Sequence, residues 1–208
     1  MIKAVIFDYD GVVKKSQKFS LAIADLYKIS VEEYEKFIPK LKPIIEKFDK
    51  GLIAEEKFWI EFSSVLGKTI PEECSEKAHK MYRDNFMFFT EVIELIKNLK
   101  KQGFQLSILS NMFTYQAEIV REKNEDALFN NVFISCERGL KKPDFEFYEL
   151  VIKEINVSPQ ECLFIDDKEE NLLPAEKLGM KTVLAKNPDQ IVEDVWGIIK
   201  SESKIGNT

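Results

Sequence analysis

Two aspartates, Asp8 and Asp10, stand at the end of the first apolar segment and are the most informative residues of the chain. Ile2 and residues 4–7 form a short, nearly continuous apolar run, which is typical of a buried strand in a parallel sheet. Two carboxylates about 4 Å apart repel each other by roughly 4 kcal/mol at an effective dielectric constant of about 20. A bound cation would remove this repulsion, and a shared proton would reduce it. The pair therefore indicates a site for a cation or for a shared proton.

Three more sets of polar residues follow apolar segments further along the chain. Ser110 and Asn111 follow the second predicted strand. Lys142 lies in the loop after the third strand, and Asp166 and Asp167 follow the fourth. In open parallel sheets, ligands bind at the carboxyl ends of the strands, which lie along one edge. We therefore expect these side chains to gather with the first two aspartates at one rim of the sheet.

The residue types at this rim are complementary. Taken singly, each set is ordinary turn or capping chemistry. Together, four carboxylates could hold a hard divalent cation, which prefers oxygen ligands. A lysine, a hydroxyl and an amide could hold an anionic group, and helix N-termini nearby favour the same anion. The sequence thus predicts a site where a divalent cation and an anion bind side by side.

From residue 104 onward, apolar runs of strand length alternate with helical patterns. The predicted strands span residues 104–109, 132–135, 162–165 and 181–184. The predicted helices span residues 114–123, 145–155 and 172–178, with Thr114 and Asp144 as N-caps and Gly179 as the stop. Repeated βαβ units of this kind predict an α/β fold, a doubly wound parallel sheet with helices on both faces.

Residues 14–89 carry helical patterns and no convincing strand. The clearest helix spans residues 54–66 and ends at Gly67, with one apolar face formed by Phe58, Trp59, Phe62, Val65 and Leu66. Thr90 then caps a helix that leads back into the sheet. We therefore predict two parts, an α/β core of residues 1–13 and 90–208 and a small all-helical subdomain, residues 14–89, inserted after the first strand.

The composition excludes several classes of protein. A net charge of −6 argues against a nucleic-acid partner, because nucleic-acid-binding proteins normally present a basic face. No apolar run approaches the roughly 20 residues of a membrane-spanning helix, and no signal-peptide pattern precedes the first strand. We therefore expect a cytoplasmic protein without a membrane partner. The three cysteines are far apart and predict neither a disulfide framework nor a zinc site.

Four short motifs stand in order along the chain. They are Asp8-Tyr9-Asp10-Gly11-Val12, Ser110-Asn111, Lys142-Pro143-Asp144 and the run Phe-Ile-Asp-Asp-Lys-Glu-Glu-Asn at residues 164–171. Each motif alone is weak, but the four in this order resemble the haloacid dehalogenase-like (HAD) hydrolase superfamily. The resemblance is to its subfamily I phosphatases, which have a Rossmann-like core and a helical C1-type cap inserted after the first strand.

The resemblance implies a phosphatase mechanism. Asp8 would be the nucleophile that attacks phosphorus and becomes an aspartyl-phosphate. Asp10 would protonate the leaving oxygen and then deprotonate the attacking water. Lys142 would offset negative charge on the nucleophile and on the phosphate. The residue chemistry agrees with this, because a carboxylate can be a covalent nucleophile and phosphoryl transfer needs mainly positioning and charge stabilisation.

The resemblance also implies which residues bind the ligands. Ser110 and Asn111 would donate hydrogen bonds to the phosphoryl oxygens, together with Lys142, and Asn171 would support the acidic loop. The Mg²⁺ site implied by the resemblance consists of Asp8, Asp10 through its backbone carbonyl, Asp166 and Asp167. The implied function is that of a Mg²⁺-dependent phosphomonoesterase that acts on a small phosphorylated metabolite.

Two alternative functions stay open. Asp10 disfavours carbon–halogen cleavage, because the family's dehalogenases lack this second aspartate, whereas its phosphomutases keep both. A phosphomutase acting on a sugar phosphate is therefore one alternative, and the absence of histidine from residues 13–18 favours hydrolysis over it. A non-catalytic binding protein with the HAD fold is the other. Lys14, Lys15 and Lys18 near the entrance to the insertion could meet a second anionic group of a substrate, but we interpret them as a solvated face.

Overall fold

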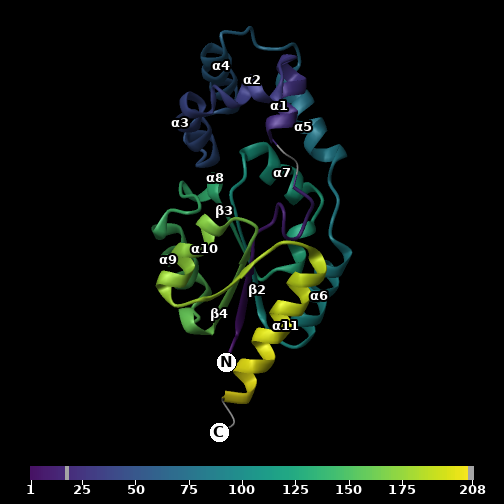
Figure 1. Cartoon of the computed structure of the whole chain (residues 1–208), viewed down its shortest axis with the longest axis vertical. Helices are drawn as coiled ribbons and strands as arrows, with labels where there is room; N and C mark the ends of the chain where they lie inside the picture. Colours follow the sequence, from purple (N-terminus) through teal and green to yellow (C-terminus); the bar gives the residue numbers. More distant parts are fainter. Residues whose placement is uncertain (17–18, 206–208) are drawn as a thin grey trace.

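The computed structural model describes residues 1–16 and 19–205, which form an α/β core with a helical part beyond one edge of the sheet (Figure 1). The strands are β1 (Ala4–Phe7), β2 (Gln105–Ser110), β3 (Asn131–Ile134), β4 (Cys162–Asp166) and β5 (Lys181–Leu184). Within the described residues they form one parallel sheet in the order β3-β2-β1-β4-β5. This confirms the predicted doubly wound parallel sheet.

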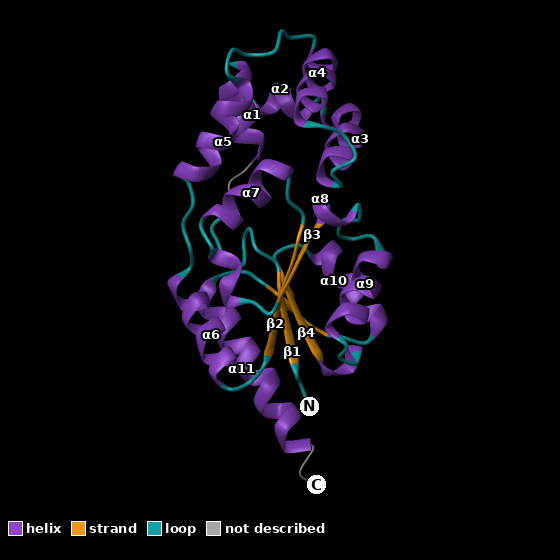
Figure 2. Ribbon diagram, turned by 180° about the vertical axis from the view of Figure 1, so that it is seen from behind, coloured by secondary structure: helices purple, strands orange, loops and turns teal. Residues whose placement is uncertain are grey.

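Helices cover both faces of this sheet. The helices of the core are α6 (Thr90–Lys101), α7 (Thr114–Glu122), α8 (Ser135–Arg138), α9 (Phe145–Ile155), α10 (Glu169–Leu178) and α11 (Pro188–Ile205), with short 3-10 helices η1 (Glu125–Leu128) and η2 (Pro159–Glu161). Figure 2 shows the strands between α6 and α11 on one side and α9 and α10 on the other. In the part of the chain that the structure describes, no helix combines the length and the apolar content needed to cross a bilayer.

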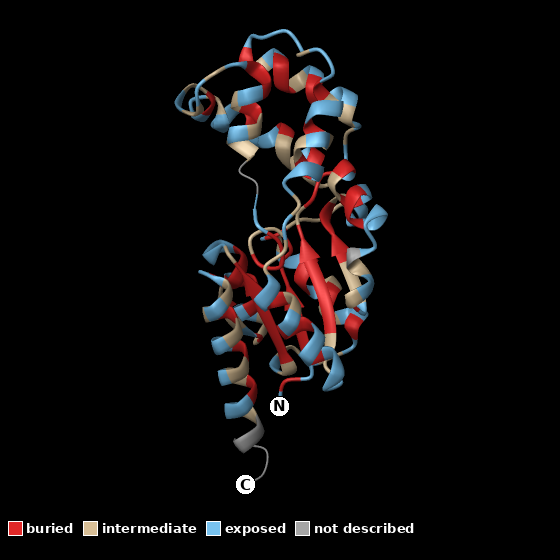
Figure 3. Cartoon of the chain, turned by 90° about the vertical axis from the view of Figure 1, so that its right-hand side faces the viewer, coloured by how far each residue is buried: buried red, intermediate tan, exposed pale blue. Residues whose placement is uncertain are grey.

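Side chains of each strand alternate between two hydrophobic clusters, as the pleat of a strand requires. Val5 and Phe7 of β1 pack in the cluster that contains residues of α6 and α11. Ala4 and Ile6 pack in the cluster that contains residues of α9 and α10. Figure 3 shows the central strands as buried. The continuous apolar run at the start of the sequence is therefore the mark of a strand covered on both faces.

The register of β1 brings the polar loop ends to one level of the sheet. Phe7 pairs with Ile108 of β2 and with Ile165 of β4. Asp8 directly follows Phe7, and Asp166 directly follows Ile165, so the two carboxylates lie on neighbouring strands at the same edge. The hydrogen bond from Asp8 N to Ile165 O, 2.8 Å long, continues the ladder to this point.

Between β1 and α6 the chain forms a helical insertion. It contains α1 (Phe19–Tyr27), α2 (Val31–Glu35), α3 (Ile38–Asp49), α4 (Glu55–Leu66) and α5 (Cys74–Asp84), and it lies over the carboxyl ends of the strands (Figure 1). Phe48 of α3 stacks on Phe58 of α4, with 4.3 Å between ring centroids. Phe48 also stacks on Phe113, which precedes α7, at 4.6 Å. The insertion therefore has its own apolar cluster, and this cluster continues into the core at α7.

The two connections between core and insertion run side by side. Lys15 N donates to Met87 O at 2.8 Å, and Phe89 N donates to Val13 O at 3.0 Å. These bonds pair residues 13–15 with residues 87–89 as a short antiparallel ribbon. The two ends of the insertion thus leave the core next to each other.

Helix boundaries agree with the predicted ones to within a few residues, but two predicted caps are wrong. Thr114 and Thr90 are the first residues of α7 and α6, and Phe113 and Phe89 hold the N-cap positions. The backbone N–H of Phe113 donates to Gln116 Oε1 at 2.9 Å, and Phe113 has no hydroxyl that could accept from the first turn of α7. Helix α4 ends at Gly67 as predicted, with φ of +65°.

Candidate active site

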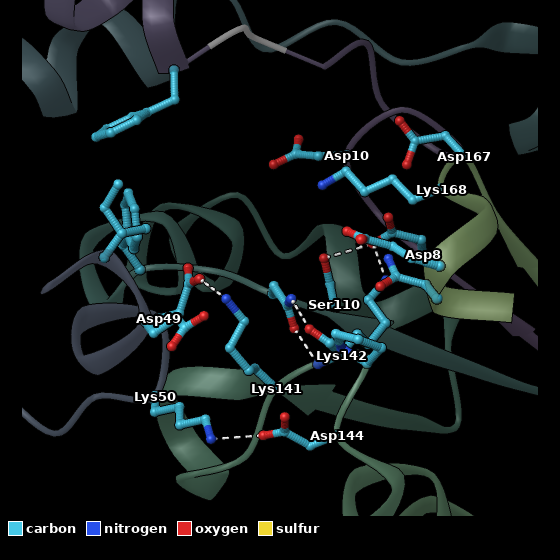
Figure 4. Close-up of a pocket in the computed structure, with 18 of the residues that line it drawn as sticks. Asp8, Asp10, Asp49, Lys50, Ser110, Lys141, Lys142, Asp144, Asp167 and Lys168 are labelled. Atoms are coloured by element: carbon cyan, nitrogen blue, oxygen red, sulfur yellow. Dashed lines mark hydrogen bonds and ion pairs between the residues drawn. The ribbon is translucent and has the colours of Figure 1, made fainter. Parts of the chain in front are cut away.

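The predicted site residues surround one cavity of about 430 Å³ at the carboxyl edge of the sheet (Figure 4). Those that line the cavity are Asp8, Asp10, Ser110, Asn111, Lys142 and Asp167. Asp166 lies behind them and has no exposed surface. The fold thus gathers residues from four separate loops, as their positions after parallel strands predict.

One oxygen of the Asp8 carboxylate is fixed by several donors. Asp8 Oδ1 accepts hydrogen bonds from Tyr9 N at 2.6 Å and from Ser110 Oγ at 2.9 Å. Lys142 Nζ lies 2.9 Å from the same oxygen. None of these contacts involves Asp8 Oδ2. The carboxylate is therefore held in one orientation by Oδ1, while Oδ2 is left for contact with a ligand.

Lys142 is buried between two carboxylates. Besides its contact with Asp8, its Nζ donates a hydrogen bond of 2.5 Å to Asp166 Oδ2. Burial by itself would lower the pKa of Lys142, but attraction to Asp8 and Asp166 outweighs burial and raises this pKa. The lysine therefore stays charged at neutral pH and balances the two acids.

Asn111 fixes the loop that carries Lys142. Its Nδ2 donates to Lys142 O at 2.9 Å, and its Oδ1 accepts from Lys142 N at 2.8 Å. These two bonds occupy the amide side chain. The expected contact between Asn111 and a phosphoryl oxygen stays a prediction.

Asp166 and Asp167 are neighbours with different surroundings. Asp166 Oδ1 accepts hydrogen bonds from Lys168 N and from Asn171 Nδ2, both at 2.9 Å, and its Oδ2 is bonded by Lys142. Asp167 Oδ1 is buried and has no hydrogen-bond partner among the described residues. Hydrogen bonds thus hold both oxygens of Asp166 within the protein, whereas Asp167 has an oxygen available for a cation.

The three carboxylates of Asp8, Asp166 and Asp167 can share one cation. One ligand oxygen from each lies within 4.8 Å of the others. Burial raises the pKa of Asp167, and the charge of Asp8 raises it further. The same two causes raise the pKa of Asp166 to about 6. A divalent cation would relieve this crowding of negative charge, and hard cations prefer oxygen ligands. These residues therefore fit Mg²⁺.

The loop after β1 packs against the acidic loop without room for a side chain. A Cβ atom on Gly11 would lie 2.5 Å from Asp167 Oδ2. The φ angle of Gly11 is +95°, which side chains rarely allow. The glycine of the first motif therefore sets how closely the two acidic segments approach.

The Asp10 carboxylate is set apart from the other acids. Figure 4 shows it turned away from Asp8. Its Oδ1 forms an ion pair with Lys14, and its Oδ2 lies 3.5 Å from the hydroxyl of Tyr82. Burial raises the pKa of Asp10, although the charge of Lys14 acts in the opposite direction. The Asp10 carboxylate therefore faces the insertion rather than the acids that fit a cation.

Lys14 corrects one interpretation of the sequence. We expected Lys14, Lys15 and Lys18 to form a solvated face, but the side chain of Lys14 is only 1% exposed. Its ammonium lies over the ring of Tyr82 and pairs with Asp10, so charge and ring contacts replace water. Lys15 is exposed as expected, and Lys18 lies outside the described residues.

The insertion supplies a wall of the cavity that the motifs do not mark. Helix α3 contributes Lys42, Ile45, Glu46 and Asp49, and Lys50 directly follows it. These residues have no local signature, because each is an ordinary residue of an amphipathic helix. The sequence feature that relates this wall to the core is complementary charge. Asp49 pairs with Lys141, and Lys50 pairs with Asp144.

Comparison with known proteins identifies the family. Residues 2–179 match the sequence model of the haloacid dehalogenase-like hydrolases. The match spans most of the chain and includes all four polar motifs. The protein therefore belongs to the haloacid dehalogenase-like hydrolase family and is an enzyme, as the motifs predict.

Several curated relatives are phosphatases. A sesquiterpene phosphatase of Aspergillus oryzae is 31% identical over 136 residues, which are 65% of this chain and 68% of that protein. A glyceraldehyde 3-phosphate phosphatase of Methanocaldococcus jannaschii is 27% identical over 194 residues, 88% of this chain and 84% of that one. A D-ribitol-5-phosphate phosphatase of Bacteroides thetaiotaomicron is 24% identical over 214 residues, 97% of this chain and 100% of that one.

A solved structure shows the same fold. A HAD family enzyme of Bacteroides thetaiotaomicron, determined in complex with magnesium and inorganic phosphate, superposes with a TM-score of 0.73 and 24% sequence identity. The superposition covers 89% of this chain and 95% of that chain. The core and the insertion thus follow the architecture of that enzyme.

Proposed function

We propose that this protein is a Mg²⁺-dependent phosphomonoesterase that hydrolyses a small phosphorylated metabolite through an aspartyl-phosphate on Asp8. The observation that supports this proposal most directly is the orientation of the Asp8 carboxylate. Its Oδ1 is fixed by Ser110 and Lys142, and its Oδ2 makes neither contact. A nucleophile held in one orientation attacks more readily than a mobile one.

Asp8 Oδ2 attacks the phosphorus in the proposed first step, and the bond to the leaving oxygen breaks. Lys142, 2.9 Å from Asp8, balances the charge on the nucleophile and on the phosphoryl group. The backbone N–H of Asn111 holds one phosphoryl oxygen, and the Ser110 hydroxyl turns from Asp8 Oδ1 to another when the substrate binds. A water molecule then attacks the aspartyl-phosphate, which releases inorganic phosphate and restores the carboxylate of Asp8.

Asp8, Asp167 and the backbone carbonyl of Asp10 are the proposed ligands of Mg²⁺. Mg²⁺ would supply the positive charge that lets an anionic nucleophile approach an anionic substrate. We assign Asp167 rather than Asp166 as the direct ligand of the acidic loop. The unpartnered Oδ1 of Asp167 supports this assignment, as do the hydrogen bonds that occupy both oxygens of Asp166.

Asp10 is the proposed acid and base. Its carboxylate lies apart from Asp8 and lines the cavity on the side of the insertion. A leaving group in line with Asp8 would lie on that side, because the attacking and leaving oxygens of phosphoryl transfer are roughly opposite. Asp10 would donate a proton to the leaving oxygen and later accept one from water.

Residues 14–89 are the proposed cap, and residues 1–13 and 90–208 the proposed catalytic core. The contribution of α3 to the cavity wall supports this division. A cap that closes over the cavity would exclude bulk water from the first step.

The substrate class is that of small, hydrophilic phosphate monoesters. A cavity of about 430 Å³ suits a metabolite of modest size, and charged side chains form much of its wall. Two relatives are named for ribitol 5-phosphate and glyceraldehyde 3-phosphate, which supports this class.

The test is release of inorganic phosphate. Wild type and Asp8→Asn are compared on 4-nitrophenyl phosphate and on pentitol, triose and flavin phosphates, with Mg²⁺ and with a chelator. Asp189→Asn is the matched control, because Asp189 is an exposed aspartate on α11. We expect Mg²⁺-dependent release in wild type and in the control, and none in Asp8→Asn.

The other outcomes decide between the alternatives. Full activity in folded Asp8→Asn would overturn the assignment of Asp8 as the nucleophile. An isomerised sugar phosphate without phosphate release would indicate a mutase. Binding of ligands by folded wild type without any turnover would indicate a non-catalytic protein.

A further inference from the structure

Lys14 is a buried charge outside the phosphate and metal sites. Its ammonium forms an ion pair with Asp10 Oδ1 and donates a hydrogen bond of 3.2 Å to Lys15 O. It also lies 4.6 Å from the ring centroid of Tyr82 and 5.3 Å from that of Phe86. A buried ammonium is unfavourable without such partners, so its position is determined by the carboxylate and by the two rings.

The backbone of Lys14 lies where the catalytic loop meets the attachment of the insertion. Lys14 N donates to Tyr9 O at 2.9 Å, and Lys14 O accepts from Gly11 N at 2.6 Å. On its other side Lys14 forms a β-bridge with Phe88 of the returning connection. The backbone of Lys14 is therefore fixed relative to Asp10, by the loop of residues 9–11 on one side and by the returning connection on the other.

Tyr82 connects the same carboxylate with the insertion. It lies in α5, its ring contacts the Lys14 ammonium, and its hydroxyl donates to Asp10 Oδ2 at 3.5 Å. This second contact is long and therefore weak. Asp10 is thus held through Oδ1 by Lys14, while Oδ2 has only a loose partner and borders the cavity.

We propose that Lys14 is a positioning residue, which holds Asp10 on the leaving-group side of the cavity so that Oδ2 can transfer the proton. This inference rests on the proposed phosphatase function. In the first step the proton on Asp10 Oδ2 passes to the leaving oxygen as its bond to phosphorus breaks. In the second step the same oxygen takes a proton from the attacking water. Oδ1 faces the Lys14 ammonium whether or not Oδ2 carries the proton, so Lys14 can hold Asp10 in place through both steps.

The test compares substrates that differ in their need for an acid. The aryl leaving group of 4-nitrophenyl phosphate departs as a stable phenolate without a proton, whereas an alkyl leaving group such as a pentitol requires one. The value of kcat/KM reports the steps up to departure of the leaving group, so it isolates the acid role of Asp10 from the later hydrolysis. We therefore measure kcat/KM on both substrates for wild type, Lys14→Met and Lys14→Arg. Lys15→Met is the matched control, because Lys15 is the exposed neighbour.

We expect Lys14→Met to lower kcat/KM for the alkyl ester by about tenfold or more relative to the aryl ester, since a placed general acid contributes about 100-fold or more. Lys14→Arg should restore much of the ratio, and Lys15→Met should leave it unchanged. In an Asp10→Asn background, Lys14→Met should have no further effect on the ratio. This comparison separates positioning from a general loss of folding, which circular dichroism also monitors.

Two results would overturn the inference. Equal losses of kcat/KM on both substrates in folded Lys14→Met would show a structural role only, and unchanged kcat/KM on both would show no role. Both leave the phosphatase function standing, because wild type would remain active and Asp8→Asn inactive. Inactivity of folded wild type on every ester would overturn the proposed function and this inference with it.

Discussion

Lys141 Nζ lies 2.5 Å from Asp49 Oδ2 and joins the last residue of α3 to the loop that carries Lys142. A second ion pair of opposite sense lies beside it, because Lys50 Nζ is 2.6 Å from Asp144 Oδ2 (Figure 4). Each side of this contact thus presents one acid and one base. Displacement of α3 along the loop would bring like charges together, so the pairs fix the position of α3 over the cavity.

Asp49→Asn should weaken this attachment and lower catalytic efficiency. The side chains of Lys141 and Asp49 are 16% and 14% exposed, so solvent screens their interaction only in part. A hydrogen bond between charged groups contributes roughly 1.5–3 kcal/mol, which partial exposure lowers to about 1–2 kcal/mol, and we expect kcat/KM to fall about fivefold to thirtyfold. Steady-state kinetics measure the change. Asp25→Asn on α1 is the control, since its ion pair is exposed, and an equal effect of the two variants would contradict the prediction.

Lys142→Met should destabilise the fold as well as remove activity. The variant leaves Asp8 and Asp166 buried and close together without their shared cation. Removal of one partner from a buried ion pair costs about 3–5 kcal/mol. Urea unfolding of the metal-free protein measures this loss, with Lys153→Met on the exposed side of α9 as the control. Unfolding midpoints that agree between the two variants would rule out the predicted charge balance.

Asp166 should make the stability of the metal-free protein depend on pH. Burial and the charge of Asp8 raise its pKa from the ordinary 3.8 to about 6 in the folded protein. The folded state therefore holds this proton more tightly than the unfolded state. The resulting stabilisation is fully present below pH of about 4 and is lost as pH rises through about 6.

The measurement compares urea midpoints of wild type and Asp166→Asn from pH 4 to 7 in the presence of a chelator. Wild type should lose stability relative to the variant as pH rises across this window, because asparagine does not titrate. A constant difference between the two proteins would show that Asp166 has no raised pKa. Asp189→Asn again serves as the exposed control.

Gly11→Ala should weaken Mg²⁺ binding through Asp167. The new Cβ would lie 2.5 Å from Asp167 Oδ2 and must displace that carboxylate. Gly67→Ala is the matched control, because Gly67 also has a positive φ, +65°, but nothing within 4 Å of the added atom. Both variants should lose about 1 kcal/mol or more from backbone strain. Only Gly11→Ala should lower the affinity for Mg²⁺ in calorimetric titration. Equal affinities of Gly11→Ala and Gly67→Ala for Mg²⁺ would contradict the close packing of Gly11 against Asp167.

The sheet and its acidic rim could be predicted from the sequence because their signals are local. Each strand is a short apolar run, and Asp8, Ser110 and Asp166 each come directly after a predicted strand. The carboxyl ends of parallel strands lie along one edge of the sheet, so the pattern places these three residues together. The register of β1 between β2 and β4 then confirms that Asp8 and Asp166 lie at one level.

The surroundings of these residues could not be predicted in the same way. Lys14 is a lysine in a basic stretch, and only the rings and the carboxylate that the fold brings to it make it a buried partner of Asp10. Asp49 and Lys141 are 92 residues apart, and neither lies in a motif. Such contacts depend on how the insertion packs on the core, which no local pattern records.

The adjacent connections at residues 13–15 and 87–89 make the insertion a unit that could be exchanged without cutting the sheet. A chimaera that takes this unit from a relative would be joined at one ribbon, and substrate preference should move with the exchanged helices while the reaction stays with the core. The apolar cluster of the insertion includes Phe113, which precedes α7, and Tyr115 and Ile119 of α7. A successful exchange must therefore carry the matching face of α7, or it would expose these three side chains to water.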